Sequence, residues 1–200
     1  IELDEVEILS SPRIEIESLQ NSISIRSISN EEIQNSTATN VSELLQQIAG
    51  IDVRRRGVEG MQADLYIRGG SFDQTLLLID GIKVEDPQTG HHTMNMTLPL
   101  EVIEKIEITK GSAGRIYGQN AFTGAVNIIT KKNIKNNLNV ELTGGSFDQK
   151  RGSLTVQRKL ENSDILFNYS REESEGYRYN TDFKNDELFI KSNFKIKDQK

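Results

Sequence analysis

The run LYIRGGSFDQTLLLIDGIKV, residues 65–84, decides how the first two thirds of the chain fold. Within it, TLLLI at 75–79 is almost wholly apolar, as expected of a buried strand. Asp80-Gly81 follows at once, and this dipeptide between apolar runs is the strongest short signal for a two-residue hairpin turn. IKV at 82–84 supplies the returning strand. The stretch therefore predicts a β-hairpin.

The flanking sequence predicts the rest of a mixed sheet with short helices. SISIRSIS at 22–29 alternates like a strand, and Ser29 and Glu32 have capping-box spacing. Asn40 is a suitable N-cap and Gly50 a suitable stop for a short amphipathic helix, whose apolar positions are Val41, Leu44, Leu45 and Ile48. Two runs rich in β-branched residues predict further strands: VIEKIEITKG at 102–111 and GAVNIITKK at 124–132. These elements indicate an α+β domain with a mixed β-sheet.

The composition excludes several classes of function. The 200 residues carry a formal net charge of −6, which argues against a dedicated nucleic-acid binder. Cysteine is absent, so disulfides, thiolate metal sites and cysteine nucleophiles are excluded. The glycine-rich stretch GSAGRIYGQNAFTG, residues 111–124, lacks the order of a phosphate-binding loop, and GGSFD lacks the second glycine of a nucleophile elbow. We therefore expect no catalytic residues and no enzyme.

From about residue 136 the pattern changes to strict alternation of apolar and polar residues. Four segments of about ten residues share it, with apolar positions at Leu138, Val140, Leu142, Leu154, Val156, Ile165, Phe167, Tyr169, Leu188 and Ile190. Two short turns and one long polar loop, expected over 172–186, connect them. Strands of this length with one apolar face are typical of a transmembrane β-barrel. The alternative is an antiparallel sheet packed by one face against the first domain.

One further observation bears on this choice. The fourth segment leaves an unclosed sheet edge, which natural proteins avoid, so we expect residues 136–200 to be the start of a longer barrel.

The hexapeptide GGSFDQ occurs at both 69–74 and 144–149, but the residues flanking the two copies share nothing. Glycine, serine and aspartate are what tight turns select, so we interpret the echo as shared turn chemistry and not as a repeat.

Five runs in order resemble the plug domain of TonB-dependent outer-membrane receptors: SELLQQIAGIDV, LYIRGG, TLLLIDGIKV, LPLEVIEKIEITKG and RIYGQNAFTGAVNIITK. The resemblance implies a plug at 13–135, preceded by a TonB box and linker at 1–12. It also implies that 136–200 are the first four strands of a 22-stranded barrel. The location implied is the outer membrane of a Gram-negative bacterium, with the plug inside the barrel lumen and the barrel in the lipid bilayer.

The resemblance also implies partners. Residues 4–8 resemble the TonB box, especially that of cobalamin receptors, so TonB would bind Asp4, Glu5, Val6, Glu7 and Ile8 by strand addition. An ordinary terminal strand or frayed tail is the alternative. The implied function is active uptake of cobalamin or a ferric chelate into the periplasm. The alternative is a soluble or surface module, for binding or signalling, that has a plug fold and no transport.

The implied site residues lie in two loops and at two strand ends. Candidates to face a small organic or metal-chelate ligand are Asp86, Gln88, Thr89, His91, His92, Met94, Tyr177 and Tyr179. The alternatives are plain loop structure for the first loop and, for the two tyrosines, the aromatic belt at the membrane interface. Copper binding by the histidines and methionines of 91–96 is a weaker alternative, because adjacent histidines diverge on an extended backbone. We therefore expect neither a resident metal nor a cofactor. Arg68 and Lys110 match basic positions that pair with acidic residues on the barrel wall, although lysine cannot form the bidentate fork of arginine. The alternative for both is a solvated charge at a strand end.

Overall fold

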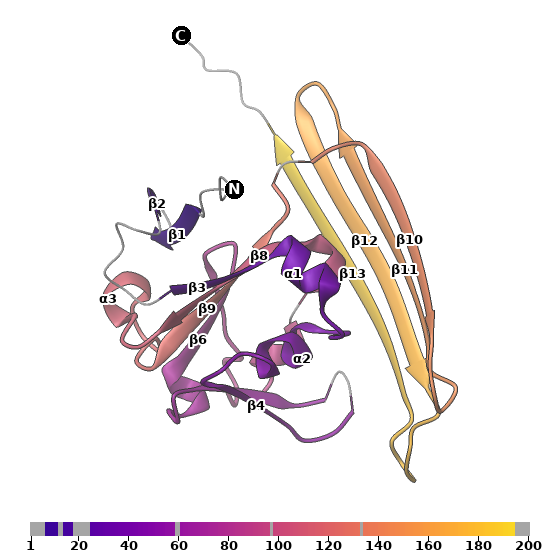
Figure 1. The fold of residues 1–200 in the computed structure, drawn as a ribbon, viewed down its shortest axis with the longest axis horizontal. Helices are drawn as coiled ribbons and strands as arrows, with labels where there is room; N and C mark the ends of the chain where they lie inside the picture. The colour runs from indigo at the N-terminus through magenta and orange to yellow at the C-terminus, as the bar shows by residue number, and fades with distance from the viewer. Residues whose placement is uncertain are drawn as a thin grey trace. The chain divides into compact units, whose positions relative to one another are not determined.

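The computed structural model describes residues 7–11, 14–17, 25–58, 61–96, 98–132 and 134–194. The chain forms two compact units (Figure 1). Unit 1 comprises residues 1–55, 62–97 and 103–130, and unit 2 comprises 56–61, 98–102 and 131–200. The polypeptide therefore leaves unit 1 twice and returns before it enters its last four strands.

A five-stranded mixed sheet is the centre of unit 1. Its strand order is β3-β8-β9-β6-β7, and β6 pairs with β9 in parallel while the other neighbours are antiparallel. The bounds are β3 Ile25–Ser29, β6 Thr75–Ile79, β7 Ile82–Val84, β8 Ile103–Lys110 and β9 Gly124–Thr130. Every residue of β9 is buried, as expected of a strand covered on both faces. The mixed sheet expected from the sequence is confirmed.

The predicted hairpin and its turn are present in this sheet. β6 and β7 pair antiparallel, and Asp80 and Gly81 between them have φ of 49° and 79°, the left-handed values that a type I′ turn requires. The Asp80 carboxylate accepts hydrogen bonds from the backbone N–H of Thr130 at 2.9 Å and from its hydroxyl at 2.6 Å. The turn is thereby tied to the last residue of β9.

Each of the two short helices begins after a residue whose side chain caps its first turn. Helix α1, Asn30–Asn35, has the predicted capping box, in which Ser29 and Glu32 satisfy each other's backbone N–H groups. Helix α2, Val41–Gln46, begins with the Asn40 side chain accepting from the N–H of Glu43 at 2.9 Å. The predicted stop at Gly50 is wrong, because α2 already ends at Gln46. Gly50, with φ of 82°, serves the turn into β4 instead.

Shorter elements complete unit 1. Strands β4 (Ile51–Arg55) and β5 (Ala63–Ile67) form an antiparallel pair, and β1 (Glu7–Ser11) pairs with β2 (Ile14–Glu17). The 3-10 helices are η2 (Phe72–Gln74) and η3 (Thr93–Met96), and α3 spans Gly114–Tyr117. The core between these elements is aliphatic, and its fully buried side chains include Ile67, Leu76, Leu77, Leu78, Ile106, Ile108 and Ile128.

Unit 2 is an antiparallel meander of four strands plus the 3-10 helix η4 (Leu100–Val102). The strands are β10 (Asn137–Gly144), β11 (Lys150–Lys159), β12 (Ser163–Ser174) and β13 (Phe183–Phe194), and they pair in chain order. The long loop is shorter than expected, 175–182 instead of 172–186. Pairing continues to Ser174↔Phe183, and Arg171 and Asp186, register partners, lie within 3.7 Å.

The two copies of GGSFDQ adopt different conformations. In the first, Gly69 has φ of 75° and Phe72–Gln74 form a 3-10 turn. In the second, Phe147 and Asp148 have φ of 59° and 54° and form the turn from β10 to β11. The same six residues thus reverse the chain in two ways, so the copies are not a repeated structural unit.

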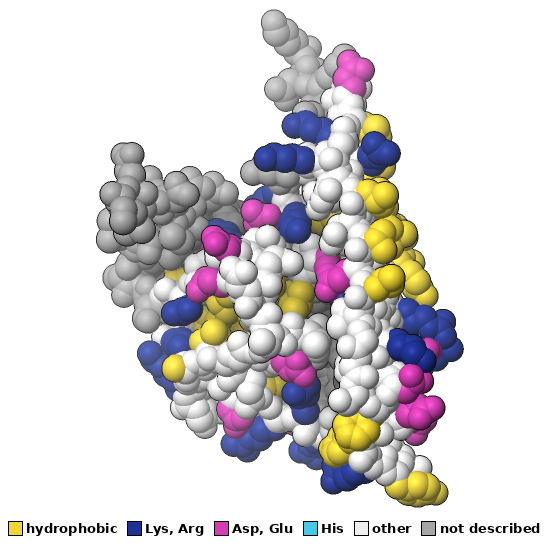
Figure 2. Space-filling view, turned by 45° about the vertical axis from the view of Figure 1, so that its right-hand side comes forward, with side chains coloured by type: hydrophobic (Ala, Val, Ile, Leu, Met, Phe, Trp, Pro, Cys, Tyr) yellow, Lys and Arg dark blue, Asp and Glu magenta, His cyan; other side chains and the backbone are white. Residues whose placement is uncertain are grey.

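Strands β11 and β12 bury their polar face, and the opposite, apolar face of the four-stranded sheet is largely exposed. Polar side chains of β11 and β12 are buried, among them Ser153, Thr155, Ser170 and the fully covered Asn168, which donates to the hydroxyls of Ser153 and Thr155. The opposite face carries Leu138, Val140, Leu142, Leu188 and Ile190, with exposures from 61% to 82%. Figure 2 shows these hydrophobic side chains gathered along the strands. Across the described residues, no helix is both long and apolar enough to cross a bilayer.

Candidate functional site

The loop that follows β7, residues 85–96, is organised by one carboxylate. Asp86 accepts hydrogen bonds from the hydroxyl of Thr89 at 2.6 Å, from the N–H of Gln88 at 3.1 Å and from the N–H of His92 at 3.4 Å. These hydrogen bonds hold the pKa of Asp86 below its usual range. The bond from the Thr89 hydroxyl has the largest effect, and the bonds from the backbone N–H groups add to it. The Asp86 carboxylate therefore caps backbone N–H groups of this loop and holds the loop in a defined conformation.

The two adjacent histidines of the loop have different surroundings. The Nδ1 atom of His91 lies 2.8 Å from a carboxylate oxygen of the buried Asp64 on β5, and its ring packs on Phe72 with centroids 4.1 Å apart. His91 is thus turned inward and half-buried. His92 is exposed, and its Nδ1 atom lies 3.4 Å from the side-chain amide of Asn95. The loop therefore presents His92, and not both histidines, to solvent.

The remaining loop candidates divide in the same way. Gln88 and Thr89 are exposed, whereas Met94 is 4% exposed and packs in the interior. Met94 therefore offers no surface to a ligand in this conformation. Among the residues that the structure describes, no group of three or more histidine, cysteine or acidic side chains is placed to hold a metal ion.

Tyr177 and Tyr179 lie on the β12–β13 loop at one end of the strand sheet. Tyr179 is 93% exposed, and Tyr177 is contacted by the guanidinium of Arg178, which lies 4.7 Å from the ring centroid. The Tyr177 ring lies 6.3 Å from that of Phe147 on the β10–β11 turn, so this turn and the loop form one end of the sheet. The two tyrosines expose amphipathic rings at that end.

The predicted TonB box is only partly within the described structure. Asp4, Glu5 and Val6 lie outside the described residues. Glu7 and Ile8 begin β1 and pair with Glu17 and Ile16 of β2. The described part of the box therefore has extended backbone, as strand addition requires.

The two basic strand-end residues lie near each other in unit 1. The Arg68 side chain is exposed, and its backbone has a φ of 53°. Together with Arg54 and Tyr66 it lines a hollow of about 460 Å³. Lys110 donates from Nζ to the carbonyl oxygen of Ala49. Within the described ranges neither side chain forms an ion pair with a carboxylate.

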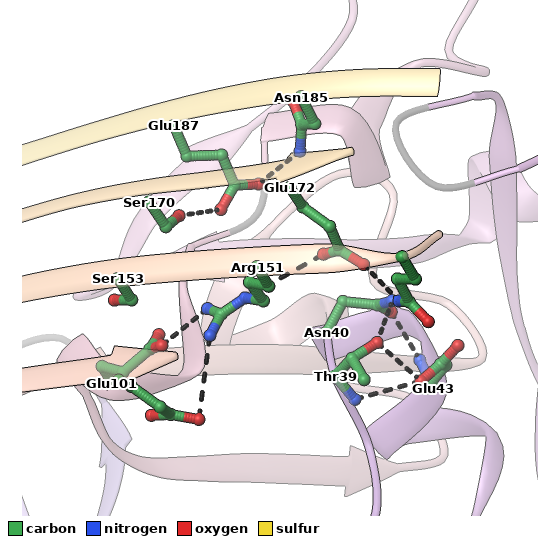
Figure 3. A network of polar contacts seen from close by, with 12 residues as sticks. Thr39, Asn40, Glu43, Glu101, Arg151, Ser153, Ser170, Glu172, Asn185 and Glu187 are labelled. Atoms are coloured by element: carbon green, nitrogen blue, oxygen red, sulfur yellow. Dashed lines mark hydrogen bonds and ion pairs between the residues drawn. The ribbon is translucent and has the colours of Figure 1, made fainter. Parts of the chain in front are cut away.

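A charged cluster in unit 2 was missed by the sequence reasoning (Figure 3). Arg151 on β11 lies 2.6 Å from Glu101 on η4, and 3.9 Å from both Glu141 and Glu172. Arg151, Glu101 and Glu172 are nearly buried. The register pairs Arg151 with Glu172, which the alternation of the strands could have indicated. Nothing in the sequence marked Glu101, fifty positions earlier, as a partner.

Comparison with known proteins gives one family match and several relatives. The family model for the TonB-dependent Receptor Plug Domain matches residues 17–125, more than half of the chain. The vitamin B12 transporter BtuB of Vibrio vulnificus (strain CMCP6) is 32% identical over 152 residues, which are 75% of this chain and 25% of that protein. BtuB of Vibrio cholerae serotype O1 (strain M66-2) is 32% identical over 127 residues, 64% of this chain and 21% of the relative.

Solved structures show the same fold at lower identity. The pyoverdine outer membrane receptor FpvA from Pseudomonas aeruginosa PAO1 has a TM-score of 0.80 at 20% identity, covering 96% of this chain and 28% of the receptor. The alcaligin outer-membrane receptor FauA from Bordetella pertussis has a TM-score of 0.73 at 15% identity, covering 92% and 31%. The chain spans about a quarter of the length of the curated relatives it matches.

Proposed function

The chain belongs to the TonB-dependent receptor plug family, and we propose that it is the plug and first barrel strands of an outer-membrane receptor for active uptake. The ligand is a scarce small molecule that binds outside and is delivered to the periplasm. No step of this function makes or breaks a covalent bond, so the protein acts as a transporter and not as an enzyme.

One observation carries the proposal beyond the family match. Of the four strands after the plug-matched region, β11 and β12 bury serine, threonine and asparagine, and β10 and β13 expose leucine, valine and isoleucine on the opposite face of the sheet. A water-soluble sheet would do the opposite, because apolar surface is driven out of water. A barrel wall needs this arrangement, with the apolar face toward lipid and the polar face toward the lumen. The observation supports an outer-membrane location for the strands.

Cobalamin is the first ligand candidate, and a ferric chelate is the second. The relatives at 32% identity are named vitamin B12 transporters, whereas the siderophore receptors are similar in fold at 15–23% identity. The side chains that we propose to contact the ligand are exposed in the two loops: Gln88, Thr89, His92, Tyr177 and Tyr179. Asp86, His91 and Met94 would instead hold the first loop in shape.

TonB is the proposed periplasmic partner. As in the family, ligand binding would expose residues 4–8, TonB would add a strand to them, and the proton-motive force transmitted through TonB would remodel the plug. Arg68 and Lys110 are proposed to pair with carboxylates of the barrel wall, which would hold the plug until that pull. Both proposals are consistent with the extended backbone of Glu7 and Ile8 and with the positions of the two basic residues at strand ends.

Ligand identity is tested by titrating the full-length receptor with cyanocobalamin and, separately, with ferric siderophores. We expect saturable binding of cyanocobalamin. Binding of a ferric siderophore in place of cyanocobalamin would replace the first candidate by the second. Binding of neither would overturn both.

The transport step is tested with variants of the box. Deletion of residues 4–8 should abolish uptake into cells and leave ligand binding unchanged. Ile8→Pro should act like the deletion because proline removes a backbone donor, whereas Ile8→Val should keep uptake because strand addition uses the main chain. Normal uptake in the deletion variant would refute the assignment of the box.

A further inference from the structure

The buried ion pair between Glu101 and Arg151 joins two segments that lie far apart in the sequence. Glu101 belongs to η4, within the residues that match the plug family, and Arg151 belongs to the second strand of the meander. Yet the segment 98–102 clusters with the strands in unit 2, and η4 contacts β12. A short piece of the plug-matched sequence is thus part of the strand unit.

The geometry makes Arg151 the centre of this attachment. Its guanidinium lies 2.6 Å from Glu101, and carboxylates of Glu141 and Glu172 are each 3.9 Å away (Figure 3). Glu172 is itself held by the side-chain amide of Gln149 at 2.6 Å. One arginine therefore balances several carboxylates, and the second oxygen of Glu101 is buried without a hydrogen-bond partner. Removing the arginine would leave buried carboxylates uncompensated, which is the costly way to break such a pair.

The position of the segment in the chain gives the attachment a functional meaning. Residues 98–102 follow one residue after the loop 85–96, the proposed ligand loop, and precede β8. We propose that Arg151 is a positioning residue that fixes the C-terminal root of the ligand loop to the barrel wall through Glu101. This proposal rests on the proposed function, because it takes the loop as the ligand loop and the strands as the wall.

Hydrogen exchange of the full-length receptor, folded in detergent or lipid, tests the proposal. In Glu101→Gln and in Arg151→Gln, amide exchange in residues 98–102 and in the loop should rise about tenfold or more, because the local opening free energy falls. The double variant should add little to Arg151→Gln, since both changes break the same pair. Arg151→Lys should be intermediate, because lysine keeps the charge and loses the fork.

The matched control is Lys150→Gln. Lys150 is adjacent to Arg151 and forms a 2.8 Å pair with Asp148, but both side chains of that pair are exposed. We expect exchange in 98–102 to be unchanged in this variant. In all variants, exchange in β3, β8 and β9 should stay at the wild-type level, because a local anchor and not global stability is changed. Glu101→Gln is the milder change and remains informative if Arg151→Gln does not fold.

Ligand binding provides the second readout, with cyanocobalamin as the probe. The Kd of Glu101→Gln should rise about tenfold, which corresponds to about 1.4 kcal/mol, while Lys150→Gln binds as wild type. Wild-type exchange at 98–102 in a folded Glu101→Gln variant would overturn the anchor. Raised exchange together with unchanged affinity would overturn its role in positioning the loop. A wild-type receptor that binds no cyanocobalamin would count against the proposed ligand, and the exchange result would still decide the anchor.

Discussion

Replacing Ile190 by arginine tests whether the exposed apolar face of β10–β13 faces lipid. Ile190 is 63% exposed and belongs to the cross-strand row Leu138, Val156, Phe167, Ile190. Along β13 the same face continues with Leu188 on one side, and the nearest charged residue of that face on this strand is Asp186. Ile190 lies four positions from Asp186 along the strand, about 13 Å at ~3.3 Å per residue. The substitution therefore places a charge well inside the apolar band.

The expected magnitude depends on the medium around the strand. In a bilayer, arginine on the lipid face of a barrel costs about 2–4 kcal/mol near the midplane, and less near the interfaces. In water, exchanging an exposed side chain usually changes the free energy of unfolding by no more than about 0.5 kcal/mol. We expect a destabilisation of about 2 kcal/mol, the lower end of the bilayer range, because a long arginine side chain can reach toward the interface.

The assay is guanidinium unfolding of the full-length receptor folded into lipid vesicles, followed by circular dichroism. Ile190→Val is the control for side-chain volume and should change stability by less than about 1 kcal/mol. Tyr179→Arg is the control for added charge, because Tyr179 lies in the exposed loop and not in the apolar band. If Ile190→Arg costs no more than Tyr179→Arg, the face does not contact lipid, and a soluble module with a plug fold becomes the better interpretation.

Three further predictions concern unit 1 in the full-length receptor. Gly124→Ala should lower the free energy of unfolding by about 1–3 kcal/mol, measured by denaturant titration, because an added Cβ would collide with backbone of β8. Asp80→Ala should cost about 1–3 kcal/mol in the same titration, because it leaves the buried N–H and hydroxyl of Thr130 without this acceptor. Burial raises the pKa of Glu43, but hydrogen bonds from Thr39 outweigh it and leave the pKa lowered. Ionised Glu43 thus stabilises the fold above its unfolded pKa of about 4.3, and this contribution is lost as pH falls through the lower folded pKa. Glu43→Gln should therefore destabilise at neutral pH, and the difference from wild type should vanish in acid; a pH-independent difference would contradict this.

Much of unit 1 follows from local sequence. Apolar runs and turn residues act over a few positions, so the hairpin at 75–84, the capping box at 29–32 and the N-cap of α2 at Asn40 could each be predicted. The stop at Gly50 could not, since α2 ends earlier and Gly50 is used in the next turn. The two copies of GGSFDQ show the limit of such reasoning. The same Phe-Asp-Gln residues form a 3-10 turn in the first copy, whereas in the second the Phe and Asp have left-handed backbone conformations.

The candidate site was predictable as a region and not as a set of contacts. The loop 85–96 could be singled out from its composition. Which side chains it exposes depends on partners elsewhere in the chain: Asp64 and Phe72 draw His91 inward, and the interior accommodates Met94. In an irregular loop the side-chain directions do not repeat with a fixed period, so they cannot be predicted from the sequence and are known only from the folded unit.

By itself, the sequence determined the mixed sheet, the alternating strands and the family, because these depend on periodicity and on motifs that are continuous in the chain. The tertiary structure alone decided that the apolar face of β10–β13 is the exposed one and that Arg151 meets Glu101. Alternation states that a strand has two faces but not which of them is covered. An ion pair between residues fifty positions apart exists only after folding brings η4 and β11 into one unit.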